Sequence, residues 1–188
     1  MNTTDSTPMQ TTLPLLDGER VRLRAYRDDD IGAIYAAYSD PKVMRYWSYP
    51  PWTERSQAEA YLKRDRDYTG DDMLAWAIAS HEDDTLIGTV TLLGIDRAQG
   101  RADVGYALAA AHWGHGYAQE AVRLALAHAF DALQLRRIEA DVDPRNAGSC
   151  KLLERLGFKR EGLLRERWLV NGELQDSAIF GLLQDELK

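Results

Sequence analysis

Two glycines and a histidine stand between an apolar run and a long amphipathic segment, within Trp113–Ala118. The run before them, Ala102–Leu108, alternates like a strand, and the segment after them repeats apolar residues at a helical period. A strand that ends in a glycine-rich turn and opens a helix offers unpaired backbone N–H groups, and about half a positive charge, to an anion. Gly114 and Gly116 lack the Cβ atoms that would keep a ligand's oxygens from the backbone, and His115 adds a donor. The pattern predicts a phosphate-binding turn, with a tight turn that binds nothing as the alternative.

The turn fits neither of two familiar nucleotide-binding patterns. The dinucleotide fingerprint needs a third glycine where Gln119 stands, and it follows the first strand of its domain. The phosphate loop of nucleotide triphosphatases needs Gly-Lys followed by Ser or Thr, which this turn lacks. Other parts of the chain must therefore identify the phosphate compound.

The elements that position this turn follow from apolar periodicity and capping signals. Strands are expected at residues 21–25, 73–80, 86–95, 102–108, 137–142, 158–170 and 175–183. Helices are expected after the acidic residues 28–30, at about 54–67, after the glycine turn and at 147–156. This mixture predicts one domain of the α/β or α+β class.

Length and composition also fit a single globular domain. The chain has 188 residues, 45% hydrophobic and 28% charged, and no apolar run approaches the roughly 20 residues needed to cross a bilayer. Residues 1–16 are polar, lack Lys and Arg, and are expected to form a disordered tail before a domain at 17–188. The only cysteine, Cys150, excludes an intramolecular disulfide and fits a reducing cytoplasm.

The charge balance indicates the kind of partner. A net charge of −7, from 30 acidic and 23 basic residues, argues against direct nucleic-acid binding and favours cationic partners such as amines or basic peptides.

Two further groups of side chains have more than one interpretation. An aromatic segment surrounds two prolines, and it either rims a pocket or, as is more frequent, packs beneath a loop; its members are Tyr46, Trp47, Tyr49 and Trp52. His112 and His115 are three apart, but no third ligand accompanies them, so no metal is expected.

Four stretches of the sequence carry a resemblance to a known family. They are RLRAYRDDD with SDPKVMRYW, ADVGYAL with HWGHGYAQEA, VDPRNAGSCKLLERLGFKREG, and NGELQDSAIFGLL. In this order they resemble the GNAT superfamily of acetyl-CoA-dependent N-acetyltransferases, and within it the branch of bacterial ribosomal-protein N-terminal acetyltransferases. The resemblance spans about residues 17–185. It implies a single α+β domain with a mixed, mostly antiparallel twisted sheet, helices on both faces, and a split at the acetyl-CoA site between residues 102–108 and 137–142.

The resemblance also assigns residues to acetyl-CoA. The family's pyrophosphate loop corresponds to Trp113, Gly114, His115, Gly116, Tyr117 and Ala118, with Trp113 at a position that many members fill with Gln or Arg. Asn146 stands where the family's Asn meets the pantetheine arm, and it is also a suitable helix cap. A backbone N–H near Tyr106, Ala107 and Leu108 is expected to stabilise the oxyanion of the reaction.

Acyl transfer to an amine needs a neutral amine, a stabilised oxyanion and a proton for the departing thiolate. An α-amino group, with a pKa near 8, is roughly a tenth neutral at pH 7, whereas lysine is neutral only about once in a few thousand molecules. A weak base therefore suffices for a protein N-terminus. Asp103, on the strand before the loop and on the face opposite Val104 and Tyr106, is the candidate to orient the amine or accept its proton, directly or through water. An exposed strand charge is the alternative.

The proton donor for the thiolate is suggested by the resemblance alone. Many members carry a tyrosine in the helix before Gly-Phe, but Leu153 stands there in this chain. In the ribosomal-protein branch a serine at the position of Ser149 is the candidate to hydrogen-bond or protonate the thiolate. Cys150 is not required as a nucleophile.

Together these features predict a cytoplasmic enzyme, monomeric or homodimeric, that moves an acetyl group from acetyl-CoA to the N-terminal α-amine of a protein of the ribosomal type. Two alternatives remain. One is transfer to a small-molecule amine such as an aminoglycoside, polyamine or amino acid, and the other is a coenzyme-A-binding sensor without turnover.

Overall fold

The computed structural model describes residues 13–68 and 70–188. Its strands are β1 (Leu16–Asp17), β2 (Val21–Arg24), β3 (Met73–Ser80), β4 (Leu86–Asp96), β5 (Arg101–Leu108), β6 (Arg137–Val142), β7 (Lys159–Val170) and β8 (Glu173–Leu183). Its α-helices are α1 (Ile31–Ser39), α2 (Pro41–Met44), α3 (Arg55–Arg66), α4 (Tyr117–Asp131) and α5 (Ala147–Leu156). Short 3₁₀ turns lie at Asp28–Asp30, Ala110–His112 and Gln184–Glu186.

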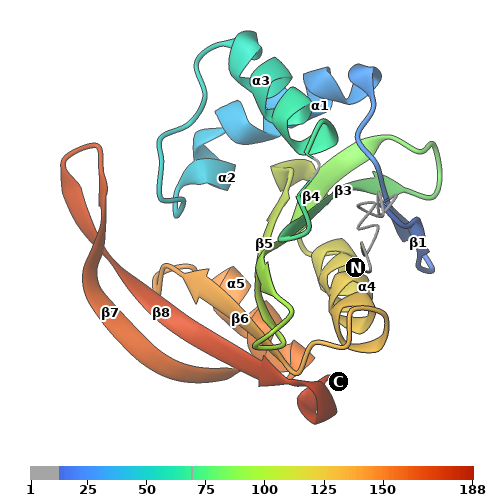
Figure 1. Ribbon diagram of the computed structural model, residues 1–188. Helices are drawn as coiled ribbons and strands as arrows, with labels where there is room; N and C mark the ends of the chain where they lie inside the picture. Colours follow the sequence, from blue (N-terminus) through green and yellow to red (C-terminus); the bar gives the residue numbers. More distant parts are fainter. Residues whose placement is uncertain (1–12, 69) are drawn as a thin grey trace, which may run out of the picture.

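The strands form one twisted sheet in the order β1-β2-β3-β4-β5-β6-β8-β7 (Figure 1). Each neighbouring pair is antiparallel except β5 and β6, which run parallel. The parallel pair requires a crossover connection, and α4 supplies it. The predicted α+β class, with a mixed and mostly antiparallel sheet, is confirmed.

The sheet is split between β5 and β6. Their pairing begins at Arg101↔Arg137 and ends at Asp103↔Glu139. Beyond that rung β5 continues to pair with β4 as far as Leu108, and β6 continues to pair with β8 as far as Val142. The two strands therefore diverge over 104–108 and 140–142, the later parts of the ranges where the family resemblance implied a split.

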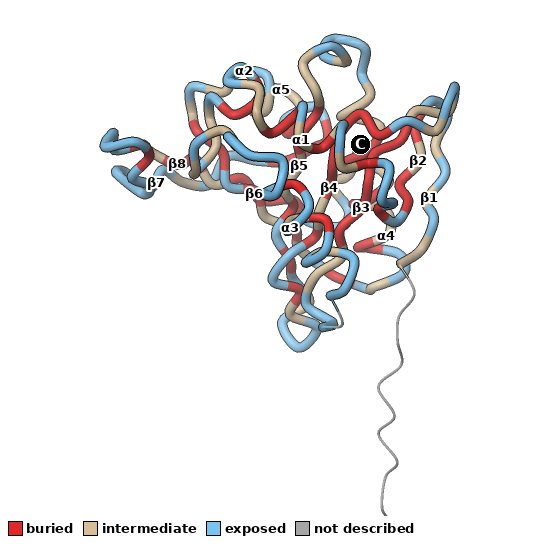
Figure 2. The backbone as a smooth tube through the Cα atoms, turned by 90° about the horizontal axis from the view of Figure 1, so that it is seen from above, coloured by how far each residue is buried: buried red, intermediate tan, exposed pale blue. Residues whose placement is uncertain are grey.

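Helices cover both faces of the sheet, each over its own apolar core. Val104 packs with α4 and α5 in one core, and Ala107 packs with α1 and α3 in the other. Positions an odd number apart on a strand face opposite sides, so these two residues of β5 mark the two layers. Along α4 the stripe that faces the sheet is fully buried, at Ala121, Val122, Ala125, Leu126 and Ala129. Figure 2 shows the buried residues concentrated in this body, from which the β7–β8 hairpin extends; β7 is largely exposed, whereas much of β8 is buried.

The aromatic segment after α2 packs beneath its loop, which was the more frequent of its two expected outcomes. Trp52 stacks on Tyr38 of α1 with ring centroids 4.6 Å apart, and Trp47 meets Tyr38 edge-on at 5.5 Å. The Tyr38 hydroxyl lies 2.8 Å from that of Thr89 on β4. The segment thus packs on α1, and Tyr38 joins α1 to the sheet.

Of the predicted tail, residues 1–12 lie outside the described residues. The part that is described contacts the body, because the Trp76 indole N–H donates to the Pro14 carbonyl at 2.8 Å and Leu16 pairs with Leu23. The boundary between tail and domain remains a prediction. None of the helices in residues 13–68 and 70–188 is both long and apolar enough to cross a membrane.

Candidate functional site

The glycine turn ends in a helix whose first N–H groups are open to a ligand. Gly114 and Gly116 have φ of 81° and 82°, a left-handed conformation that favours glycine. The first helical bond of α4 runs from the Glu120 N–H to the Gly116 carbonyl at 3.1 Å. The N–H groups of Tyr117 and Ala118 precede this bond and point out of the helix end. The turn thus has the open N–H groups that an anion site needs, and the binding of an anion there stays a prediction. The positive φ angles supply the reason for its glycines.

Arg20, in the turn between β1 and β2, holds this loop from the side. Its guanidinium donates to the His115 carbonyl at 2.7 Å and to the Glu120 carboxylate at 2.9 Å, and its backbone N–H donates to the same carboxylate at 2.8 Å. It also lies over the Tyr117 ring, 5.4 Å from the centroid. Partial burial acts against ionisation of Glu120, but these hydrogen bonds outweigh it and lower the pKa of that carboxyl. Sequence reasoning missed Arg20 because no local pattern connects residues this far apart.

Replacing Arg20 by glutamine is expected to raise the KM for acetyl-CoA about five- to tenfold, with a smaller effect on kcat. Glu120 would then carry an unpaired negative charge in the first turn of α4, where it repels a bound pyrophosphate. Steady-state kinetics with varied acetyl-CoA measure this effect. Arg27→Gln is the matched control, because Arg27 makes a similarly exposed ion pair with Asp84 on another surface. An unchanged KM in the Arg20 variant would contradict the role.

The free edge of β5 opposite β6 carries the candidate oxyanion donors. The Ala109 N–H donates to the Ile87 carbonyl at 2.9 Å, on the side of β4. Successive residues of a strand direct their N–H and C=O groups to alternate edges, so Leu108 and Tyr106 face the split, whereas Ala107 faces β4. The Trp113 indole N–H confirms this for Leu108, since it donates to that carbonyl at 2.7 Å. Of the predicted trio, Tyr106 and Leu108 keep an N–H toward the gap.

Asp103 lies at the last rung before the split, opposite Glu139. Its side chain is accessible to solvent, while Val104 beside it is buried, as the strand alternation predicted. The protein around Asp103 removes part of its hydration and raises the pKa of its carboxyl, and the nearby charges of Glu139 and Asp141 raise it further, against an opposing effect of Arg101. Glu139 pairs with Arg137, and Asp141 accepts from Ser177. In the part of the chain that the structure describes, Asp103 is the one of these carboxylates without a hydrogen-bond partner.

The start of α5 brings Ser149 to the other side of the split. Asn146 caps this helix, and its side-chain oxygen accepts from the Ser149 N–H at 3.1 Å. The Ser149 hydroxyl lies 2.7 Å from the Tyr106 hydroxyl, which comes from β5. Burial raises the pKa of Tyr106 well above its ordinary value, so this phenol keeps its proton. Leu153, where many family members have a tyrosine, is fully buried.

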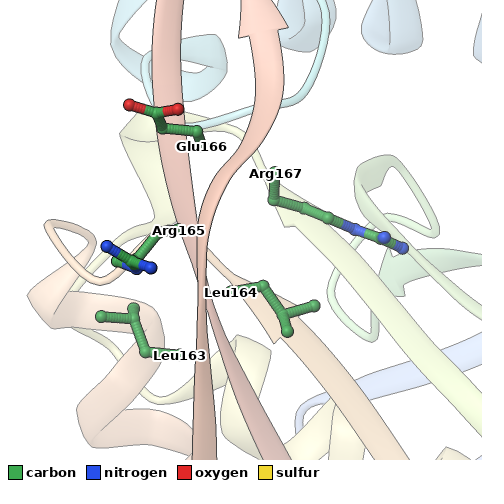
Figure 3. Close-up of a pocket in the computed structure, with 5 residues that line it drawn as sticks. All are labelled: Leu163, Leu164, Arg165, Glu166 and Arg167. Atoms are coloured by element: carbon green, nitrogen blue, oxygen red, sulfur yellow. The ribbon is translucent and has the colours of Figure 1, made fainter.

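Two features remain, the histidine pair of the turn and a hollow on the surface. Within residues 13–68 and 70–188, no group of three or more His, Cys, Asp or Glu side chains is arranged to hold a metal ion. The His112 and His115 rings instead contact Tyr117, at centroid distances of 6.2 Å and 5.9 Å. An open hollow of about 540 Å³ lies on the β7–β8 hairpin, lined by residues 163–167 of β7, which include none of the predicted site residues (Figure 3).

A coenzyme with a pyrophosphate and a thioester fits this arrangement. The N–H groups at the start of α4 suit the pyrophosphate, the unpaired edge of β5 suits the acyl carbonyl, and Ser149 lies across the split from that edge. When bound, such a coenzyme supplies an activated acyl group. Asp103 lies at the apex of the split, where an incoming amine can be oriented.

The comparisons with known proteins agree with a site for such a coenzyme. Residues 20–159 match the family model for the acetyltransferase (GNAT) domain. The uncharacterized N-acetyltransferase p20 of Bacillus licheniformis is 39% identical over 89% of this chain and 95% of its own length. Among solved structures, Mycobacterium smegmatis RimJ in complex with CoA-disulfide is 26% identical with a TM-score of 0.82, over 96% of this chain and 90% of that one. Spermidine N-acetyltransferase from Vibrio cholerae, in complex with CoA and spermine, is 28% identical with a TM-score of 0.76, over 88% and 96%. The chain belongs to the GNAT family of N-acetyltransferases.

Proposed function

We propose that this enzyme transfers the acetyl group of acetyl-CoA to the N-terminal α-amine of a protein of the ribosomal type, by direct attack in a ternary complex. The observation that carries the proposal is Asp103, a solvent-accessible carboxylate of raised pKa at the apex of the split. An α-amine is already partly neutral at pH 7, so a carboxylate of this kind is a sufficient base. Asp103 is exposed, and the aromatic segment after α2 packs against Tyr38; an accessible carboxylate suits a chain end.

The state of the Cys150 thiol supports direct attack by the amine. Cys150 lies on α5, and burial raises the pKa of its thiol, so it is protonated and a poor nucleophile near neutral pH. In the proposed reaction Asp103 orients the amine and accepts its proton. The Leu108 and Tyr106 N–H groups bind the developing oxyanion, and Ser149 donates to the departing sulfur.

A polyamine is the second candidate acceptor. The carboxylates of Asp103, Glu139 and Asp141 on one face of the sheet suit a polycation as well as a basic peptide. The spermidine N-acetyltransferase structure, which contains CoA and spermine, supports this alternative by its similarity to the chain. Either acceptor fits the cytoplasm, and so does a chain with a single cysteine.

A panel of acceptors tests the proposal. The purified protein is incubated with acetyl-CoA and peptides with free Ala, Ser or Met N-termini, matched peptides whose only amine is a lysine, spermidine, and an aminoglycoside. We expect a mass gain of one acetyl group on the α-amine peptides, and at least about tenfold lower rates on the lysine-only peptides, because few lysine amines are neutral. Transfer to spermidine alone would replace the proposal with the polyamine alternative. Coenzyme binding without transfer to any acceptor would favour a sensor.

A further inference from the structure

We propose that Tyr106 is a positioning residue that orients the Ser149 hydroxyl toward the sulfur of the coenzyme. The two hydroxyl oxygens are 2.7 Å apart, although Tyr106 lies on β5 and Ser149 on α5. Their contact crosses from one side of the split to the other. The inference rests on the proposed role of Ser149 and adds a second residue to it.

The direction of this hydrogen bond follows from the number of protons that the two hydroxyl groups carry. A serine hydroxyl has one proton, and a neutral phenol also has one. Burial keeps the Tyr106 phenol neutral. When Tyr106 donates to the Ser149 oxygen, the serine's own proton is free to point at a third atom. When the direction is reversed, the serine has no proton left to offer. A negatively charged sulfur selects the first direction, since it accepts and cannot donate.

The backbone of Ser149 is fixed as well. Its N–H donates to the Asn146 side chain at 3.1 Å, within the first turn of α5. Both the main chain and the hydroxyl of Ser149 are therefore held before any ligand binds, which is the condition for stabilising a charge without reorganisation. The N-terminus of α5 adds its own preference for a negative charge. This pair places a donor near the thiolate in a chain that has Leu153 where many relatives have a tyrosine.

The test uses the thiol of bound CoA as a probe, because it requires no acceptor. CoA is titrated in complex with a slight excess of protein, and the ultraviolet absorbance of its thiolate is followed below the pH at which exposed tyrosines ionise. The titration of the free protein is subtracted, which removes the contribution of Cys150. We expect the pKa of CoA bound to the wild-type protein to lie about one unit below that of CoA free in solution, titrated in the same way.

Two single variants and their double variant measure the coupling between Tyr106 and Ser149. Tyr106→Phe and Ser149→Ala are each expected to raise the pKa of bound CoA by a similar amount, and the double variant is expected to match Ser149→Ala alone. With the best acceptor of the panel, each single variant is expected to lower kcat about tenfold, the effect of one hydrogen bond to a charged group, while the KM for acetyl-CoA stays within about twofold. Tyr38→Phe is the matched control, since it removes a buried tyrosine hydroxyl that bonds Thr89 at 2.8 Å. It is expected to lower Tm and leave the pKa of bound CoA unchanged.

The results distinguish a failure of the positioning role of Tyr106 from a failure of the role of Ser149. If Ser149→Ala raises the pKa of bound CoA and Tyr106→Phe does not, the positioning role is wrong and Ser149 acts alone. If Tyr106→Phe lowers kcat as much in the Ser149→Ala background as in the wild type, Tyr106 acts by another route and the inference also fails. If Ser149→Ala changes neither the pKa of bound CoA nor kcat, the proposed role of Ser149 fails, and the positioning role of Tyr106 fails with it.

Discussion

Replacing Gly116 by leucine is expected to abolish acetyl-CoA binding, with at least about a 100-fold loss of affinity. Gly116 caps α4 with φ of 82°, and a Cβ built on it would lie 3.1 Å from the Arg20 guanidinium. The leucine side chain would therefore displace Arg20 or shift the turn, and the N–H groups of the loop would no longer converge on one anion. Isothermal titration calorimetry with CoA measures the affinity directly, and it does not depend on which amine is the acceptor.

Gly172→Leu is the matched control for backbone strain. Gly172 lies in the β7–β8 turn with φ of 83°, and a Cβ there would meet nothing within 4 Å. Both leucine variants are expected to cost about 1–2 kcal/mol in the free energy of unfolding, because both place a side chain in the left-handed region. Only the Gly116 variant should lose CoA binding. Wild-type affinity in that variant would show that the glycine turn does not hold the coenzyme.

Asp103→Asn is expected to lower kcat about 100-fold with an α-amine peptide, the lower range for loss of a general base. The carboxylate form accepts the proton, so wild-type kcat should fall as the pH drops through the raised pKa of Asp103. In the asparagine variant this ionisation should disappear from the acid side of the pH profile. A carboxyl whose pKa is raised by folding costs stability at higher pH, where it is ionised, so the variant should be at least as stable as the wild type near pH 7.

Glu139→Gln provides the control for Asp103. Glu139 raises the pKa of Asp103 by its charge, and its partner Arg137 retains a second ion pair with Glu161. We expect this variant to keep its kcat at neutral pH and to move the acid side of the profile to lower pH. A kcat within about twofold of wild type for Asp103→Asn would mean that Asp103 is an exposed strand charge and not the base.

Local patterns in the sequence were sufficient for most of the fold. The strand at Arg137–Val142 and the helix at Ala147–Leu156 have the predicted bounds, since each combines a clear periodicity with a turn or cap at its ends. The short elements β1 and α2 were missed, because two and four residues are too few to show a period. The split itself was predicted from family resemblance, and no periodicity within either strand encodes it.

The site also has features that local sequence indicates and contacts that only the tertiary structure shows. By itself the sequence determined the glycine turn before α4, the carboxylate on the face of β5 opposite Val104, and the Asn cap of α5, because each depends on residues that are neighbours in the chain. Only the tertiary structure decided that Arg20 holds the loop and that Tyr106 meets Ser149. These contacts join residues 95 and 43 positions apart. They exist because β2 packs beside α4 and because β5 and β6 diverge to let α5 approach. The packing of whole elements brings such distant residues together, and no local pattern in the sequence indicates it.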